Sequence, residues 1–181
     1  MDEQDFQELK AKAVEELLRV GKCYETGDGV GKDEAEAVKW YRMAAEQGLA
    51  EAQFELGRCY AFGVGVRQNS ATAAKWLHKA AEQRHVRAML MLGIWYRSGC
   101  GVEENPREAV KWLRRAADGG DARAMFELGE CYDEGVGVKK DFDAAYLWFC
   151  RAAVAAPEDE QLYQMVQSRI FSPELKEVLG R

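Results

Sequence analysis

Residues 51–83 have the sequence EAQFELGRCYAFGVGVRQNSATAAKWLHKAAEQ, and this stretch decides the fold because the chain contains four versions of it. Its characteristic residues return every 36 positions. A fixed period of this length is the sequence signature of a solenoid, in which similar units stack one after another. The main columns are Gly21, Gly57, Gly93 and Gly129; Tyr24, Tyr60, Tyr96 and Tyr132; and Trp40, Trp76, Trp112 and Trp148.

Each unit is predicted to form two antiparallel helices. Apolar and small residues recur in both halves of the unit at the spacing that places them on one helical face. Small residues such as Gly57 and Ala80, set against Tyr60 and Trp76, let the two helices approach closely. These faces comprise Ala52, Leu56, Gly57 and Tyr60 in the first half, and Ala73, Trp76, Ala80 and Ala81 in the second.

The segment between the two helices has turn and capping residues. A Gly-x-Gly-Val sequence supplies backbone that can adopt positive φ at a helix C-terminus. Pro106 suits the first position of the following helix, and Asp33 with Glu36 fits a capping box. The second helix of each unit opens after a residue of N-cap type: Asp33, Asn69, Asn105 and Asp141.

The pattern A-x3-L-G-x2-Y-x2-G-x-G-V-x2-D/N-x3-A-x2-W-x3-A-A resembles the Sel-1-like repeat (SLR) family, a relative of the tetratricopeptide repeats. The resemblance covers about residues 14–157 in four copies. Departures include Glu16 and Val20 in the first copy, and Arg84 and Ala156 at the inter-repeat glycine. The resemblance implies an all-α fold, an α/α superhelical solenoid of four 36-residue repeats with capping helices, which serves as a protein scaffold or adaptor.

The period also predicts the domain boundaries. One long helix is expected over residues 2–25, with an acidic N-terminal part that caps the array. A capping helix is expected to start at Pro157, and a last short helix at Ser172. This tail is expected to cover Leu147 and Trp148, or alternatively to dock on a partner. The predicted parts are residues 1–13 (cap), 14–49, 50–85, 86–121 and 122–157 (repeats), and 158–181 (C-terminal capping helices).

Composition excludes several classes of function. The chain has 181 residues and a net charge of −6, which disfavours a general nucleic-acid binder because phosphate contacts need a basic surface. It has no apolar run long enough to span a membrane, and its N-terminus lacks the apolar core of a signal peptide. We therefore expect a cytoplasmic protein, and its five cysteines are expected to be free thiols.

Motifs for catalysis, metal or cofactor binding are absent from the sequence, so we expect no enzyme activity, no metal and no cofactor. The two histidines, His78 and His85, have no ligand cluster at metal spacing. The glycine-rich residues 27–34 resemble a phosphate loop, but Thr26 and Asp33 stand where glycine and Ser or Thr are required. No S-x-x-K motif supports the β-lactam binding described for some SLR proteins.

By the resemblance to tetratricopeptide arrays, the first helix of each unit lines a concave groove. Leu18, Phe54, Leu90 and Phe126 would form an apolar track along it, or would pack partly between helices. Phe62 and Ile94 would widen this track. The groove residues that we predict to bind a peptide are Phe54, Arg58, Phe62, Arg87, Leu90, Ile94, Arg97, Arg123 and Phe126.

The arginines of this set suggest the chemistry of a partner. Guanidinium groups bind carboxylates with two parallel hydrogen bonds, so the groove could clamp an acidic peptide or a free C-terminal carboxylate. The alternative is that the arginines pair with Glu51, Glu55, Glu127 or Glu130. We predict a monomeric, non-enzymatic scaffold or adaptor that binds proteins. The alternatives are a self-assembling structural repeat protein, a regulatory subunit or a β-lactam-binding enzyme.

Overall fold

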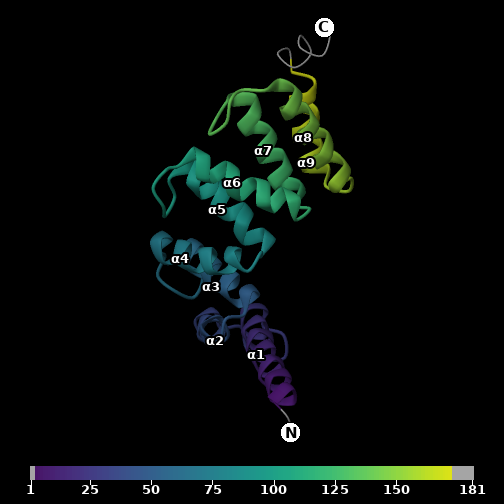
Figure 1. The fold of residues 1–181 in the computed structure, drawn as a ribbon. Coiled ribbons are helices and arrows are strands. Elements are labelled where there is room, and N and C mark those ends of the chain that lie inside the picture. Colours follow the sequence, from purple (N-terminus) through teal and green to yellow (C-terminus); the bar gives the residue numbers. More distant parts are fainter. Residues whose placement is uncertain (1–2, 173–181) are drawn as a thin grey trace. The chain divides into compact units, whose positions relative to one another are not determined.

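The computed structural model describes residues 3–172, and within this range the regular structure is entirely helical (Figure 1). The chain divides into two compact units, residues 1–88 and 89–181. None of the helices within residues 3–172 is both long and apolar enough to cross a membrane. The helices are α1 (Glu3–Thr26), α2 (Glu34–Glu46), α3 (Ala50–Phe62), α4 (Ser70–Glu82), α5 (Val86–Ser98), α6 (Pro106–Asp118), α7 (Ala122–Glu134), α8 (Phe142–Ala155) and α9 (Glu160–Ile170).

The predicted helix pairs are confirmed: α1 packs on α2, α3 on α4, and α7 on α8. The glycine column explains how they approach. A Cβ atom added to Gly129 would lie 2.6 Å from Cε1 of Phe149 on the facing helix, so no larger residue fits without a shift. We expected the tryptophan and tyrosine columns to fill the space beside the glycine. The space is filled instead by the residue that comes directly after the tryptophan in each repeat. Its column, Tyr41, Leu77, Leu113 and Phe149, is fully buried.

The turns also follow the prediction. Gly63 and Gly135 end α3 and α7 with φ angles of 74° and 78°. The predicted capping box of Asp33 and Glu36 is only half formed. Asp33 accepts from the backbone of Glu36, but its own N–H donates to the carbonyl of Tyr24, at 2.8 Å. The four predicted N-caps all accept a hydrogen bond from the third residue of their helix: Asp33, Asn69, Asn105 and Asp141.

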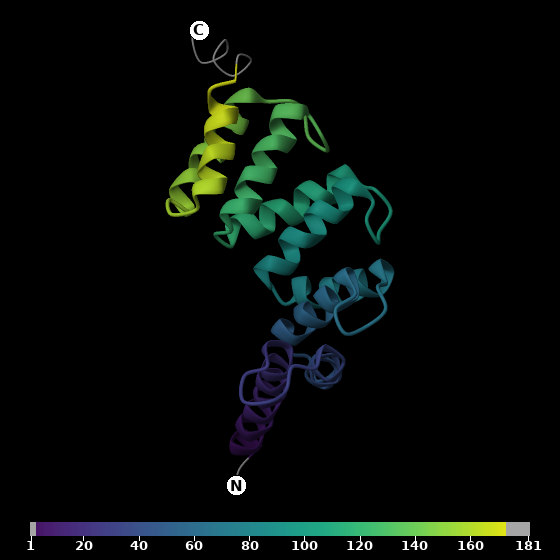
Figure 2. The same ribbon diagram turned by 180° about the vertical axis from the view of Figure 1, so that it is seen from behind.

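The two ends of the array differ in their packing. Described side chains of α1 before Val14 are exposed, including Leu9. At the other end α9 buries Leu162 and Val166 against α8 (Figures 1 and 2). This tail helix does not cover Leu147, which remains 62% exposed, so that part of the prediction is wrong. The last short helix that we predicted from Ser172 lies outside the described residues.

Candidate functional site

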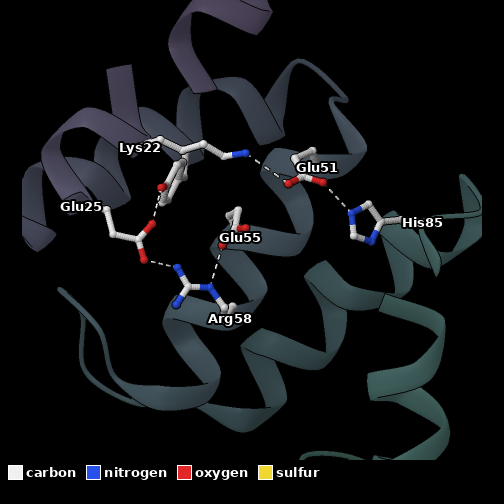
Figure 3. A network of polar contacts seen from close by, with 7 residues as sticks. Lys22, Glu25, Glu51, Glu55, Arg58 and His85 are labelled. Carbon is white, nitrogen blue, oxygen red and sulfur yellow. Dashed lines mark hydrogen bonds and ion pairs between the residues drawn. The ribbon is translucent and has the colours of Figure 1, made fainter. Parts of the chain in front are cut away.

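In the first unit, α1 and α3 are joined by a network of charged side chains (Figure 3). Arg58 is at its centre. Its guanidinium forms an ion pair with Glu25 of α1, and its Nε donates to Oε2 of Glu55 at 2.6 Å. The other oxygen of Glu25 accepts from the hydroxyl of Tyr41 at 2.5 Å. Arg58 is thus already held by two carboxylates of its own chain.

Ionisation in this network follows from its bonds. Burial disfavours the charged form of Glu25, but the hydrogen bonds from Tyr41 and Arg58 outweigh burial and lower the pKa of its carboxyl. Burial and the same Glu25 carboxylate raise the pKa of Tyr41. The ion pair with Arg58 is therefore fully charged at neutral pH, with a neutral tyrosine beside it.

Glu51, one turn before Glu55 on α3, bridges two further groups. Its Oε1 lies 3.3 Å from Nζ of Lys22, and its Oε2 lies 2.8 Å from Nε2 of His85 (Figure 3). Burial opposes ionisation of Glu51, but the bonds from His85 and Lys22 prevail and lower the pKa of this carboxyl. The network therefore leaves none of its three carboxylates, Glu25, Glu51 and Glu55, without a donor.

The second unit contains a similar arrangement. Nη1 of Arg97 lies 3.1 Å from Oε2 of Glu127 and 3.5 Å from Oε2 of Glu130. Arg123 approaches Oε1 of Glu127 at 3.3 Å, and Arg169 of α9 pairs with Glu130. Arg58, Arg97 and Arg123 therefore all form ion pairs with glutamates, as the alternative prediction stated.

The apolar track is largely buried. Phe54 and Phe126 are only 4% and 2% exposed, and Phe126 packs against Phe149 with ring centres 5.4 Å apart. Phe54 and Phe126 therefore pack between helices, which is the alternative that the sequence left open for this column. Leu18, Leu90 and Ile94 are half-buried. Phe62 is different, with 65% of its surface exposed at the end of α3.

Arg87 and Arg123 are the exposed arginines of the predicted set. The guanidinium of Arg87 lies 4.5 Å from the ring centre of Phe54, which also stacks on His85 with ring centres 4.7 Å apart. The side chain of Arg123 is 52% exposed. The structure thus places Phe54, Arg58, Phe62 and Arg87 in the first unit, and Leu90, Ile94, Arg97, Arg123 and Phe126 in the second.

Two contributors were missed by sequence reasoning. Tyr41 lies next to a tryptophan of the repeat, where the pattern indicates packing and gives no sign of a polar role. His85 lacks a ligand cluster, and its position gives no direct sign of a bond to Glu51. A signal for the ion pairs did exist, since Glu25 and Arg58 are opposite charges separated by 33 residues. Across the described residues, no group of three or more His, Cys, Asp or Glu could hold a metal ion.

Comparison with known proteins identifies the repeat. The model of the family described as Sel1 repeat matches residues 17–49, 50–85, 86–121 and 122–153. A Sel1 repeat protein from Oxalobacter formigenes is 42% identical over 81% of this chain, with a TM-score of 0.77. The antigen c5321, present in uropathogenic Escherichia coli strains and displaying an SLR fold, is 33% identical over 92% of this chain, with a TM-score of 0.81.

The chain spans 59% and 34% of the lengths of those two proteins. Helicobacter pylori cysteine rich protein B is 23% identical with a TM-score of 0.56, covers 74% of this chain and 95% of its own, and supports the fold alone. A comparison with the curated proteins gives no significant match. The helices and these similarities confirm the predicted all-α, tetratricopeptide-like solenoid class.

Proposed function

Because the chain belongs to the Sel1 repeat family, whose repeats are generally non-catalytic protein-interaction scaffolds, we propose that it is a scaffold or adaptor that binds a peptide or partner domain on its first-helix face. The observation that carries this proposal is the exposure of Phe62, the last residue of α3. Arg58 lies one helical turn earlier on the same face. Exposed aromatic residues beside arginine are the usual anchors of protein interfaces.

The partner places an apolar side chain on Phe62. In the first unit, Arg58 lies one turn away and is already paired with Glu25 and Glu55. A partner carboxylate can therefore bind Arg58 only by displacing one of these two glutamates. An isolated carboxylate offers no advantage over Glu25, which is already in place and hydrogen-bonded to Tyr41. Arg58 therefore positions α1 against α3, and Phe62 supplies the affinity.

An acidic partner segment or a free C-terminal carboxylate is accommodated by Arg87 or Arg123. Both arginines are exposed residues, and a guanidinium fork can bind a carboxylate through two bonds. Charge reversal of Arg87 or Arg123 should therefore weaken the binding of an acidic partner more than Arg58→Gln does. Equal losses in the three variants would contradict this assignment.

Site-specific photo-crosslinking tests the proposed surface. A photoreactive phenylalanine analogue replaces Phe62 in one variant and Met43 in another, and each variant is irradiated in a lysate of the source organism. Met43 is the matched control because it is also exposed, at 48%, but lies on the second helix α2. We expect an adduct with another protein from position 62 and none of that mass from position 43.

Phe62→Ala and Met43→Ala, tested in affinity capture, provide a second measurement. Loss of the partner with Phe62→Ala alone supports the first-helix face. Loss with Met43→Ala alone, or an adduct from position 43 alone, would move the interface to the second helices. An adduct of two copies of this chain would favour the self-assembling alternative.

A further inference from the structure

His85 lies between α4 and α5, and its two ring nitrogens make different bonds. Nδ1 accepts a hydrogen bond from the backbone N–H of Ala88 at 3.2 Å, and Nε2 lies 2.8 Å from Oε2 of Glu51 (Figure 3). Because Nδ1 accepts, the proton of the neutral ring is on Nε2, which donates to the carboxylate. The bonds around the ring therefore select one neutral tautomer.

The bond from Ala88 makes His85 the N-cap of α5, since Ala88 is the third residue of that helix. Asp121, 36 residues later in the same column, caps α7 in the same way: its Oδ1 accepts from the N–H of Ala124 at 2.8 Å. The two caps differ in one respect. A carboxylate has several acceptor sites, whereas a neutral imidazole has a single one and loses it when it is protonated.

We propose that His85 is a proton-sensitive N-cap, in which protonation breaks the hydrogen bond from Ala88 and leaves a charged pair with Glu51. A proton on Nδ1 would face the N–H of Ala88 as donor against donor. The resulting cation would also lie at a helix N-terminus, where the aligned peptide dipoles disfavour positive charge. Protonation therefore strengthens one contact of His85 and removes the other.

The charged groups around His85 act in opposite directions. Glu51 of α3 favours the protonated ring. Lys22 of α1 disfavours the protonated ring and pairs with the other oxygen of Glu51. Arg87 of α5 also disfavours it, because its guanidinium contacts the Phe54 ring on which His85 stacks. Arg84, the residue before His85, adds a further positive charge. The first turn of α5 thus responds to the balance between one carboxylate and three cations.

The test is an NMR titration of the full chain between about pH 8 and about pH 5, the range in which histidine usually gains its proton. The ring nitrogens of His85 and the backbone amide of Ala88 are followed together. We expect the Nε2–H tautomer at high pH. As the ring gains its proton, the Ala88 amide should shift and its hydrogen exchange, relative to the intrinsic rate at each pH, should accelerate about fivefold.

His85→Asn provides the matched control, because asparagine keeps an acceptor for Ala88 but does not titrate. In this variant the Ala88 amide should be constant over the same range. A wild-type Ala88 amide that stays unchanged while His85 titrates would overturn the proposal, as would a His85 ring that never titrates in this range. The same Ala88 response in His85→Asn would assign it to another group and also overturn it.

Discussion

Glu25 and Arg58, 33 residues apart in the sequence, form an ion pair that joins α1 to α3. Arg97 and Glu130 repeat this relationship between α5 and α7, again 33 residues apart, but with the charges exchanged. In each pair the first residue holds the twelfth position of one repeat and the second holds the ninth position of the next. Opposite charges at these two columns therefore link neighbouring first helices, whichever sign comes first.

Arg58→Gln should lower the free energy of unfolding by about 2 kcal/mol, because Glu25 and the buried Glu55 both lose their cationic partner. Breaking a fully buried pair costs more, but the side chain of Arg58 is 25% exposed. Urea unfolding measures the change. Lys39→Gln, which breaks the exposed pair with Glu36, should cost much less. Similar losses for both variants would show that the Arg58 network contributes little.

Acid should destabilise the first unit through Glu25 and Glu51, whose carboxyl pKa values lie below the ordinary 4.5. Burial opposes this lowering, but the hydrogen bonds and charges of their partners outweigh it. A carboxyl with a lowered folded-state pKa adds stability above its unfolded pKa, and this contribution is lost as the pH falls through the folded value. We therefore expect the urea midpoint to fall as the pH decreases below 4.5.

The double variant Glu25→Gln/Glu51→Gln tests the assignment of this acid sensitivity. Its urea midpoint should start lower at neutral pH and should change less than the wild-type midpoint below pH 4.5. An unchanged slope would mean that other carboxyl groups cause the acid destabilisation.

The helix pairs could be predicted because the repeat presents each packing contact four times. A column such as Gly21, Gly57, Gly93 and Gly129 reveals a close helix approach even when a single glycine would be ambiguous. The exposure of groove positions was less predictable. Phe54 and Phe62 are both aromatic residues of α3, but neighbouring side chains bury the first and leave the second exposed. Tertiary packing decides this, and local periodicity does not encode it.

The pairing of the arginines was left open by the sequence for a related reason. Arg58 has glutamates within reach both on its own helix and on α1, and choosing between these and an external carboxylate requires interatomic distances. His85 as a cap was equally hidden, because histidine is uncommon at that position. Asp121 occupies the same position in the next repeat and is a common N-cap residue. This correspondence is the signal that could have revealed the cap at His85.

Thiol reactivity should differ sharply between the buried and the exposed cysteines. Burial raises the pKa of Cys59 and Cys131 to about 11, so their reactive thiolate forms are scarce at neutral pH. Cys100 is exposed in a turn. We expect a maleimide reagent to modify Cys100 in the native protein and to reach Cys59 and Cys131 only after unfolding in urea, as measured by peptide mass spectrometry. Rapid native labelling of Cys59 would contradict the packing of α3.

Gly129→Ala should destabilise the protein because the added methyl group meets the ring of Phe149 on α8 at 2.6 Å, and overpacking of this kind costs about 1–3 kcal/mol. Gly31→Ala is the control, since a Cβ there has no neighbour within 4 Å and alanine restricts the unfolded chain. The control should leave stability unchanged or raise it slightly. Truncating the facing ring in Gly129→Ala/Phe149→Leu should recover part of the loss. Alanine also has the higher helix propensity, so a loss at position 129 must come from packing. If urea unfolding shows equal losses for the two alanine variants, contact with Phe149 does not explain the glycine column.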